Sequence, residues 1–432
     1  MTHGIIIIQF LLLIDDSICD IHNRKPNSLM KKILDQIIKL TLILLLAGIT
    51  GCSTVGYYWQ AANGHLSLVN SKQDIKSLLA TTHSLTDKQE HKLRYILELR
   101  HYAAQHIGLP VDNAYSSYVP SEPSCKQTTT ASTKNQSTRH CNENKERAIV
   151  WNVFAAKPFS LEPKSWCYPV IGCAHYRGYF KREAAEAHAH KIQQQGYETL
   201  IGGATAYSTL GWFSDPVLHG FLELNEVELA ALLFHELTHR AIYINGDTAF
   251  NESLATAIEQ FMLERWLNHL SQREFFYQTD GTNHDLAKID LKNLTKQHNK
   301  YLKRQQTFAH LISEVTITRS ELKTIYTSDA TEIEKSFLKE QTFKTLKTRL
   351  EAYITKEPAA VWLRQWATDL NNAKLIPVQS YNQWVAPLRE QLIAQLDSNA
   401  CQWRDSDFTM TICKDSLAEY FEKLKKDRLK NK

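Results

Sequence analysis

The chain has 432 residues, of which 43% are hydrophobic, and a formal net charge of +4. A chain of this length and composition can bury one large core or two modest ones, and its composition argues against disorder. The net charge is small and no basic stripe with interleaved aromatic residues occurs, so the sequence argues against nucleic acid as a partner.

The first segments indicate export. Residues 30–51 begin with a methionine and two lysines, and a short apolar run follows at 40–48. This pattern is typical of a signal peptide, and the run is too short to span a bilayer comfortably. Residues 49–52 resemble a bacterial lipobox, and this resemblance implies acyl chains on Cys52 that anchor the protein in a membrane. Ser53 then indicates the outer membrane, with the protein facing the periplasm. The alternative is a plain cleaved signal with a core cysteine at position 52. In either case, residues 1–29 precede a complete signal and are interpreted as an over-extended start.

The next segment has a helical pattern. Apolar residues recur at three- and four-residue spacing between positions 57 and 109, so a helical N-terminal layer is expected over residues 52–120. Residues 121–147 are rich in serine, threonine, asparagine and lysine, and we expect a polar insertion loop without a catalytic residue there.

Residues 148–270 are predicted to form the core that carries the chemistry. Short β-like runs at 148–154 and 200–207 flank a helical pattern at 183–195. Two strands around a helix predict a small α+β unit, which then continues into helices.

Asn225 is a plausible N-cap with Glu228 three residues later, so a helix is predicted from there through Ile244. Another helix is expected to begin near Asn251, with Asn251 as its N-cap. Residues 271–432 are charged and helical in pattern and are predicted to form a helical C-terminal subdomain. The predicted fold class is therefore α+β and predominantly helical.

Six cysteines remain when Cys19 and Cys52 are set aside, and an exported chain meets an oxidising compartment. No CxxC pattern occurs, so the sequence does not favour metal binding by these thiols. The six fall into pairs that are close in sequence, which predicts three local disulfides, although the spacing alone leaves other pairings open. The predicted pairs are Cys125–Cys141, Cys167–Cys173 and Cys401–Cys413.

Residues 235–239 form the HExxH pattern. On a helix, His235 and His239 lie on one face and can reach one metal ion, while the carboxylate of Glu236 beside them can accept a proton from water. Catalytic zinc takes three protein ligands and leaves one position open. The preceding residues are apolar all round, so the helix is expected to be buried and its polar side chains need partners.

Glu252 is the predicted third ligand, because it opens the next helix thirteen residues beyond His239. The metzincin pattern requires glycine and histidine where the chain has Ile242 and Asn245, so that class is excluded. The alternative interpretation is a buried helix whose histidine and glutamate side chains hydrogen-bond one another, with Glu252 an ordinary first-turn carboxylate.

Over most of the mature chain, the sequence resembles the putative zinc aminopeptidase lipoprotein family of Gram-negative bacteria. The insertion around Cys125 and Cys141 departs from the family pattern and affects no catalytic position. The segments that carry the resemblance are Tyr57-Tyr58-Trp59-Gln60-Ala61, Trp151-Asn152-Val153, Trp166-Cys167, Gly172-Cys173, residues 176–180, residues 206–213, residues 234–239, Phe250-Asn251-Glu252 and residues 371–375.

The resemblance implies a zincin-like core with a small β-sheet beside the HExxH helix, one Zn²⁺ ion held in the gluzincin manner, and a peptide substrate. It also implies that Glu236 takes a proton from the attacking water and passes it to the leaving amine. A strand upstream of the metal helix would pair with the substrate backbone, at Gly202, Gly203 and Ala204. The alternative is that these glycines only relieve crowding in a bent strand.

Two parts of the site stay open. The donor to the developing oxyanion could be Tyr176, Tyr207, Tyr381 or Arg177. An aminopeptidase also needs a carboxylate for the free α-amine, and the pattern does not choose among Glu183, Glu223 and Asp215. A second class of function remains as well, namely a lipid-anchored binding or assembly module that retains the metal site without turnover, because the chemistry does not require the large helical C-terminal half.

Overall fold

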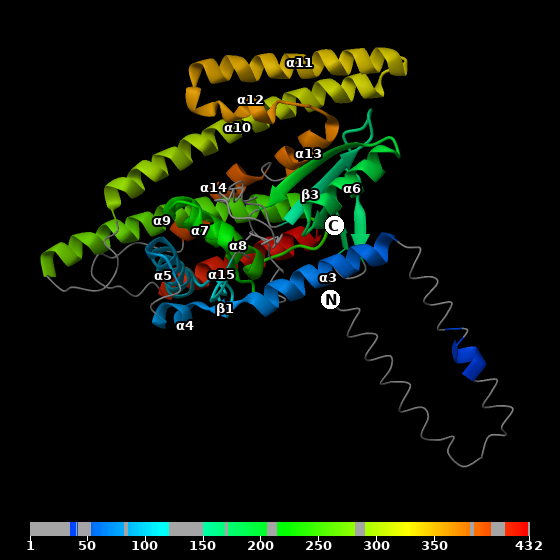
Figure 1. Ribbon diagram of the computed structural model, residues 1–432. Helices are drawn as coiled ribbons and strands as arrows, with labels where there is room; N and C mark the ends of the chain where they lie inside the picture. Colours follow the sequence, from blue (N-terminus) through cyan, green and yellow to red (C-terminus); the bar gives the residue numbers. More distant parts are fainter. Residues whose placement is uncertain are drawn as a thin grey trace, which may run out of the picture. The chain divides into compact units, whose positions relative to one another are not determined.

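The structure is a computed structural model that describes residues 35–39, 41, 53–81, 85–120, 150–168, 172–204, 214–280, 290–380, 384–398 and 411–430. The chain divides into two compact units, Met1–Asn70 and Ser71–Lys432, which are described separately. The first unit contains most of α3 (Ser53–Ser71), a helix without a charged residue (Figure 1). Cys52 and most of the predicted signal peptide lie outside the described residues. None of the helices in the described ranges combines the length and apolar character that crossing a membrane requires.

The second unit begins with helices, as the spacing of apolar residues predicts. α4 (Ile75–Ala80) is followed by α5 (Asp87–Tyr102) and by the single π-helical turn η2 (Ala103–Ile107). Thr86 and Gln89 form a reciprocal capping box that fixes the start of α5, and Leu93, Ile96 and Leu99 on its inner face are fully buried. These residues are helical, as their pattern indicates, whereas β1 (Gln73–Asp74) and β2 (Ser117–Val119) lie within the same predicted layer, whose bounds remain a prediction.

A small sheet lies beside this layer. It contains β1 (Gln73–Asp74), β2 (Ser117–Val119) and β8 (Val217–Leu218), in the order β1-β2-β8. β2 and β8 are parallel and pair Tyr118 with Val217. This pairing brings the segment before β2 next to the segment before β8, although about a hundred residues separate them along the chain.

The predicted α+β unit is an antiparallel sheet covered by a helix. β3 (Val150–Ala156) is central, between β6 (Arg177–Tyr179) and β7 (Glu198–Ala204). β3 and β7 correspond to the two β-like runs of the sequence. α6 (Arg182–Gln193) packs on both of these strands, as expected for the helical pattern between them.

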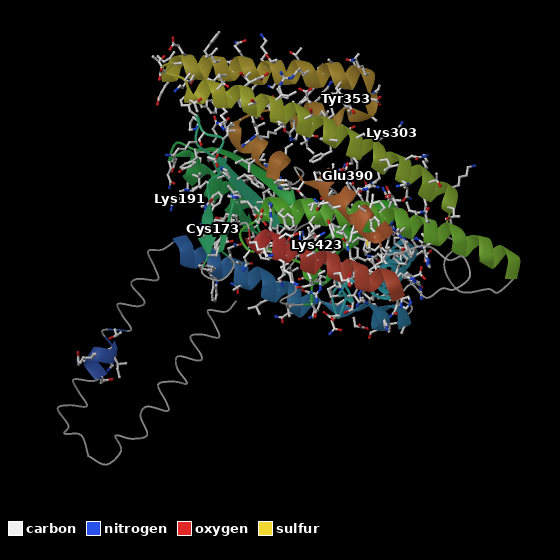
Figure 2. The ribbon with its side chains drawn as sticks, turned by 180° about the vertical axis from the view of Figure 1, so that it is seen from behind. Cys173, Lys191, Lys303, Tyr353, Glu390 and Lys423 are labelled. Atoms are coloured by element: carbon white, nitrogen blue, oxygen red, sulfur yellow. A yellow bond between two sulfur atoms is a disulfide. The ribbon has the colours of Figure 1, made fainter. Side chains whose placement is uncertain are left out.

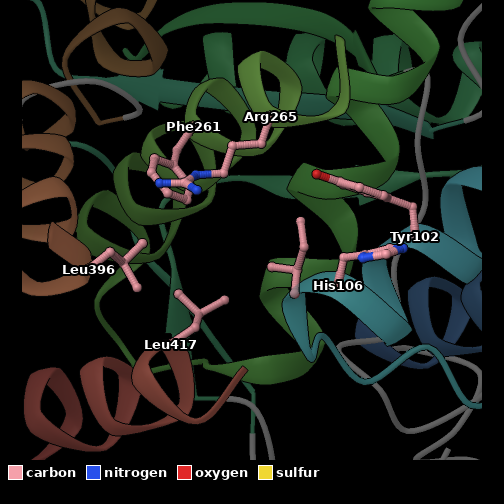
Figure 3. Close-up of a pocket in the computed structure, with 7 residues that line it drawn as sticks. Tyr102, His106, Phe261, Arg265, Leu396 and Leu417 are labelled. Atoms are coloured by element: carbon pink, nitrogen blue, oxygen red, sulfur yellow. The ribbon is translucent and has the colours of Figure 1, made fainter. Parts of the chain in front are cut away.

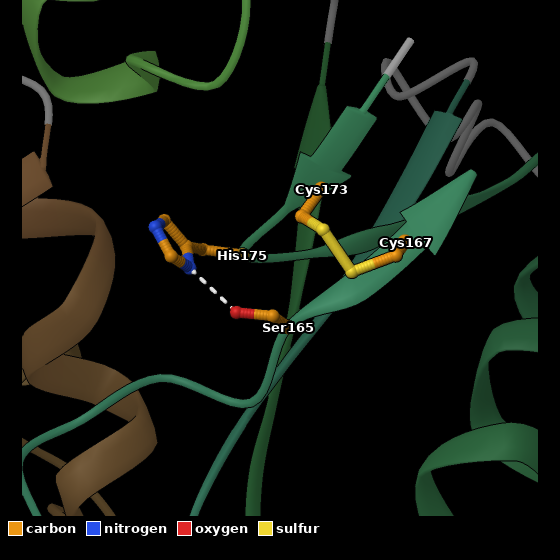
Figure 4. The surroundings of a disulfide bond; sticks show 4 residues. All are labelled: Ser165, Cys167, Cys173 and His175. Atoms are coloured by element: carbon orange, nitrogen blue, oxygen red, sulfur yellow. Dashed lines mark hydrogen bonds between the residues drawn. A yellow bond between two sulfur atoms is a disulfide. The ribbon is translucent and has the colours of Figure 1, made fainter. Parts of the chain in front are cut away.

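One of the three predicted disulfides lies within the described residues, and it is present. β4 (Trp166–Tyr168) and β5 (Gly172–Ala174) form an antiparallel hairpin in which Cys167 and Cys173 face each other and are bonded (Figure 4). Ser165 Oγ and His175 Nδ1 lie 3.3 Å apart at the open end of the hairpin. The other two predicted disulfides involve Cys125, Cys141 and Cys401, which lie outside the described residues.

Two long helices follow the sheets. α8 (Glu226–Ala241) comes after the short α7 (His219–Leu222), and α9 (Thr248–Asp280) packs along it. Asn225 caps α8 as predicted, because its side chain accepts a hydrogen bond from the Glu228 N–H at 2.9 Å.

The sequence-based bounds of the turn between α8 and α9 were wrong. α8 ends at Ala241 rather than Ile244, and α9 begins at Thr248 with Asp247 as the capping side chain, which accepts from the Phe250 N–H at 3.2 Å. Asn251 has a different role. Its side chain accepts a hydrogen bond from the Ile244 N–H at 2.8 Å and donates one to the Ile244 carbonyl at 2.9 Å. These two bonds hold Ile244 in the loop after α8.

The C-terminal half is helical, as predicted. α10 (Leu291–Thr327) and α11 (Glu332–Lys356) run side by side as a hairpin (Figure 1), and they share an apolar core with the shorter η3 (Pro358–Ala360) and α12 (Trp362–Trp366). α14 (Val385–Ser398) and α15 (Thr411–Lys430) pack together. Figure 2 labels Glu390 on α14 and Lys423 on α15. The chain is therefore predominantly helical with small sheets, and the predicted domain boundaries remain predictions.

Asn372 opens α13 (Asn372–Ser380) and joins the helical half to the sheet. The side chain is fully buried, and its Oδ1 accepts the Tyr326 hydroxyl proton at 2.8 Å. Its main-chain N–H donates to Glu198 on β7 at 2.7 Å. The side-chain amide also donates, at 2.8 to 3.1 Å, to three carbonyls in the loop after β3, those of Lys157, Pro158 and Ser160.

Candidate metal centre

α8 holds the HExxH residues in a buried helix that is anchored at its first turn. Glu226 accepts hydrogen bonds from Lys92 on α5 and from Gln297 on α10, both at 2.7 Å, and Gln297 Oε1 accepts the Val227 N–H at 3.3 Å. Burial alone would raise the pKa of Glu226, but the hydrogen bonds from Lys92 and Gln297 lower it to about 2. An ionised carboxylate at the N-terminus of α8 also suits the helix dipole.

The three predicted metal ligands lie together. His235 and His239 project from the same face of α8, and Glu252 Oε2 lies 3.3 Å from His235 Nε2 and 3.7 Å from His239 Nε2. One ligand atom from each residue lies within 4.8 Å of the other two. A tetrahedral zinc ion with bonds near 2.1 Å separates its ligand atoms by about 3.4 Å, so these three residues fit such an ion.

Glu259 is a functional residue that the sequence interpretation missed. Its Oε2 lies 3.0 Å from His235 Nδ1, while its Oε1 accepts the Tyr301 hydroxyl proton at 2.8 Å. A carboxylate at Nδ1 keeps the proton on that nitrogen, so Nε2 is left to bind a metal. Glu259 stands seven residues after Glu252 on α9, which is two helical turns, and this spacing is the signal that could have identified it.

The charges of the site favour a cation between the carboxylates. Burial would lower the pKa of His235, but hydrogen bonds with Glu252 and Glu259 raise it well above its usual value. For Glu252, burial would raise the pKa, and hydrogen bonds with His235 and His239 lower it to about 2. Both carboxylates therefore stabilise positive charge at this point, which a divalent cation would supply.

Glu236, the candidate base, lies next to His235 on α8. Its side chain is buried, and burial raises its pKa, while the charges of His235 and His239 lower it and that of Asp215 raises it. A carboxylate whose pKa lies above its ordinary value accepts a proton more readily, as general-base catalysis requires.

Asp215 and Tyr115 lie near Glu236, and the sequence did not predict that Tyr115 would lie there. Tyr115 donates its N–H to the carbonyl of Asp215 at 2.6 Å, and both residues are 1% exposed. The charges of Asp215 and Glu236 act on the Tyr115 phenol and, together with burial as the main cause, raise its pKa. Tyr115 has a φ of +54°, a strained conformation for a bulky residue, and its hydroxyl has no hydrogen-bond partner within the described part of the chain.

Among the three carboxylates considered for the α-amine, Asp215 is thus the one whose charge reaches Glu236. Its burial leaves little surface for a substrate amine, so its effect is on the base. Glu223 pairs with Lys88 at 3.0 Å, and Glu183 lies in the first turn of α6.

The remaining predicted site residues are less informative. Tyr176 packs its ring against Phe154, with the centroids 5.7 Å apart, as part of the cluster between the sheet and α13. Gly202 and Gly203 lie in β7 opposite Asn152 and Trp151. Tyr207 and Tyr381 lie outside the described residues, so their predicted roles and that of Tyr176 remain predictions.

A separate pocket lies between η2, α9, α14 and α15 (Figure 3). Its wall contains the Arg265 guanidinium, stacked 4.2 Å from the Phe261 ring, and the buried Tyr102, whose ring also contacts Phe234 on α8. None of the three candidate metal ligands lines this pocket. The lining residues are Tyr102, His106, Ile107, Phe261, Arg265, Leu396 and Leu417.

A comparison with protein families finds one that covers most of the chain. A family model described as "Putative aminopeptidase" matches residues 56–125 and 126–413, a span that includes all three candidate ligands and Glu236. Searches of the curated proteins and of the solved structures find no match.

Proposed function

Because the chain belongs to the putative aminopeptidase family, we propose that it is a zinc-dependent peptidase of the gluzincin type, with a zincin-like core and its active centre at His235, His239 and Glu252. The observation that carries this proposal is the convergence of the three ligand atoms within 4.8 Å beside the buried Glu236. Two imidazoles and one carboxylate are a ligand set of catalytic zinc, which keeps a fourth position for water or substrate.

In this proposal, His235, His239 and Glu252 would hold a zinc ion, which would supply Lewis-acid polarisation of the scissile carbonyl and would lower the pKa of the attacking water. The chain's own residues do the rest. Glu236 accepts the proton from water and delivers it to the leaving amine, and its raised pKa suits both steps. Glu259 holds His235 in the orientation that directs Nε2 at the metal.

The sheet supports a role for β7 in substrate binding. Among the described residues, β7 is the last strand in the order β6-β3-β7, and its outer edge pairs with no further strand there, although Asn371 bonds the Thr199 carbonyl. A Cβ added to Gly202 would meet only Phe154, at 3.7 Å, which is ordinary contact. Crowding within the protein therefore does not require glycine at this position, and this favours close approach of a peptide over the alternative of relieved crowding.

The proposal of aminopeptidase specificity rests on the family description. Peptides with a free and with a blocked N-terminus distinguish the two cases when their products are separated by mass. Release of the first residue from the free peptide alone supports an aminopeptidase. Internal cleavage of the blocked peptide contradicts it.

For location, we propose a protein anchored by acyl chains on Cys52, in the outer membrane and facing the periplasm. The lipobox-like residues 49–52 support it, and the disulfide between Cys167 and Cys173 agrees with an oxidising compartment. Mass spectrometry of the N-terminal peptide tests the modification, and Cys52→Ser should release the protein from the membrane fraction. An unmodified Cys52 in wild type contradicts the anchor.

The test of the peptidase proposal combines metal content with turnover. Wild type should keep one zinc ion per chain through dialysis. His239→Ala and Glu252→Ala should bind zinc much more weakly and lose it on dialysis, while remaining folded. Glu236→Gln should keep the zinc and lose peptide hydrolysis. Glu228→Gln, on the first turn of α8 and away from the ligands, is the matched control and should keep both. A folded wild type without metal would refute the proposal.

A further inference from the structure

The first turn of α9 carries Glu252 and is fixed by its own loop. Asp247 accepts the Phe250 N–H with its side chain at 3.2 Å and the Asn251 N–H with its carbonyl at 3.0 Å. The side chain of Asn251 in turn clamps the backbone of Ile244. The position of Glu252 relative to the two histidines on α8 therefore depends on this turn.

Arg428, near the end of α15, contacts the same turn. Its Nε lies 3.0 Å from Asp247 Oδ2, and the side chains of the pair are only 30% and 18% exposed. The guanidinium also lies over the rings of Phe250 and Trp384, at 4.7 and 5.2 Å from their centroids. A planar cation that pairs with a carboxylate and stacks on two rings restricts all three partners at once.

A second contact from the C-terminal helices lies on the other side of Glu252. Trp384, directly before α14, donates its N–H to Ser253 Oγ at 3.4 Å, and Ser253 is fully buried. The residues on both sides of Glu252 are thus held by groups from α14 and α15, through Trp384 and Arg428.

α15 has its own means of docking, independent of Arg428. Leu417, Tyr420 and Phe421 are buried on its inner face, and the Tyr420 hydroxyl donates to the Leu388 carbonyl of α14 at 3.0 Å. Removing the Arg428 side chain should therefore leave α15 in place and release only the turn that carries Glu252.

We propose that Arg428 is a positioning residue of the metal centre, which acts through Asp247, Phe250 and Trp384 to hold Glu252 within ligand distance of His235 and His239. This inference rests on the proposed metal site. Arg428 lies beyond residue 413, where the family match ends, so the proposed contact comes from the part of α15 that the match does not include. Loss of an outer partner of a metal ligand typically weakens metal binding by about 10- to 100-fold, and the indirect contact here suggests about tenfold.

The experiment is a double-mutant cycle on zinc affinity with the full chain, measured by competition with a chelator. Arg428→Gln should raise the dissociation constant of zinc about tenfold, and Arg428→Lys, which keeps the charge without the planar stack, should give a smaller rise. In the Glu252→Ala background, Arg428→Gln should cause no further loss, because the ligand that it positions is gone.

Arg389→Gln is the matched control. Arg389 on α14 pairs with Glu264 on the same α9 at 2.7 Å, and its side chain is 32% exposed, but the pair lies twelve residues beyond Glu252. This variant should bind zinc as wild type does. If Arg428→Gln unfolds, Arg428→Lys carries the comparison.

The outcomes separate the two proposals. Wild type without zinc would refute the metal centre and this inference together. If wild type binds zinc and both Arg428→Gln and Arg428→Lys bind it with the wild-type affinity, only the positioning role is refuted. If Arg428→Gln lowers zinc affinity equally in the Glu252→Ala background, or if Arg389→Gln lowers it as much, the fold is loosened in general. Either result would also overturn the positioning role.

Discussion

The three candidate metal ligands could be predicted to lie together at the scale of single residues, because the information is local. His235 and His239 are one helical turn apart, and Glu252 follows after a short loop, so the pattern can be read from a single stretch of sequence. Predicting the role of Glu259 would also have required knowing which face of α9 packs against α8. Tyr115 needed the parallel pairing of β2 with β8, which connects segments far apart in sequence and leaves no local signature.

Glu259 offers the sharpest test at this scale. In Glu259→Gln, an amide replaces the carboxylate at His235 Nδ1, so the hydrogen bond loses its charge and the ring its preferred orientation. We expect zinc affinity to fall by about 10- to 100-fold with little change in fold. Equilibrium dialysis against a zinc buffer measures it. Glu264→Gln, on the same helix, is the control, and unchanged affinity in Glu259→Gln would contradict the orienting role.

At the scale of elements, helices and strands were predicted well where their pattern is regular, and the turn between α8 and α9 was not. Asn251 follows the N-cap preference, but its side chain is used on the backbone of Ile244, and Asp247 caps α9 in its place. Both residue types favour the N-cap position, so propensity alone could not choose between them. The tertiary contact with Ile244 decided it.

Glu226 joins three helices, and its pKa predicts a pH dependence of stability. The folded pKa of about 2 lies below the ordinary value of 4.5, so the unfolded chain binds the proton more readily. The stabilisation is therefore present above pH 4.5 and is lost as the pH falls toward 2. Urea unfolding at a series of pH values should show a shallower acid loss in Glu226→Gln. Glu90→Gln, which removes an exposed pair with Arg94 on α5, should keep the wild-type slope.

We expect the disulfide of the β4–β5 hairpin to contribute to stability and not to catalysis. The bridge closes a loop with a sequence separation of 6, and a short loop of this kind corresponds to about 2 kcal/mol of unfolding free energy. The double variant Cys167→Ala/Cys173→Ala should lose about that much in urea unfolding, while the folded fraction keeps its zinc and its peptidase rate. A proportional loss of rate in the folded fraction would contradict this separation.

At the scale of the whole molecule, the helical character of the C-terminal half was predictable, and its attachment to the sheet was not. Residues 371–375 carry part of the family resemblance, but the sequence does not indicate their structural role. The structure shows that Asn372 makes the joint, with bonds to α10, β7 and the loop after β3. A buried polar junction of this kind depends on three distant segments, so periodicity cannot reveal it.

Asn372→Ala should therefore destabilise the protein strongly. The substitution leaves buried carbonyls and the Tyr326 hydroxyl without their partner, at a cost of roughly 2 to 4 kcal/mol in unfolding free energy. Asn371→Ala is the matched control, because Asn371 bonds Thr199 and caps α13 from a less buried position, and it should cost about 1 kcal/mol. Urea unfolding compares them, and equal losses would contradict the special role of Asn372.

α10 contacts the first turn of α8 and, through Glu259, the candidate metal site. Gln297 holds the first turn of α8, and Tyr301, one helical turn later, holds the carboxylate that orients His235. Any opening of α10 at this point releases the start of α8 and Glu259 in the same event. In native-state hydrogen exchange, amides around residues 227–235 and 297–301 should therefore exchange with one shared opening free energy, as a single cooperative unit. The opening of this unit would then set how long the candidate metal centre stays assembled.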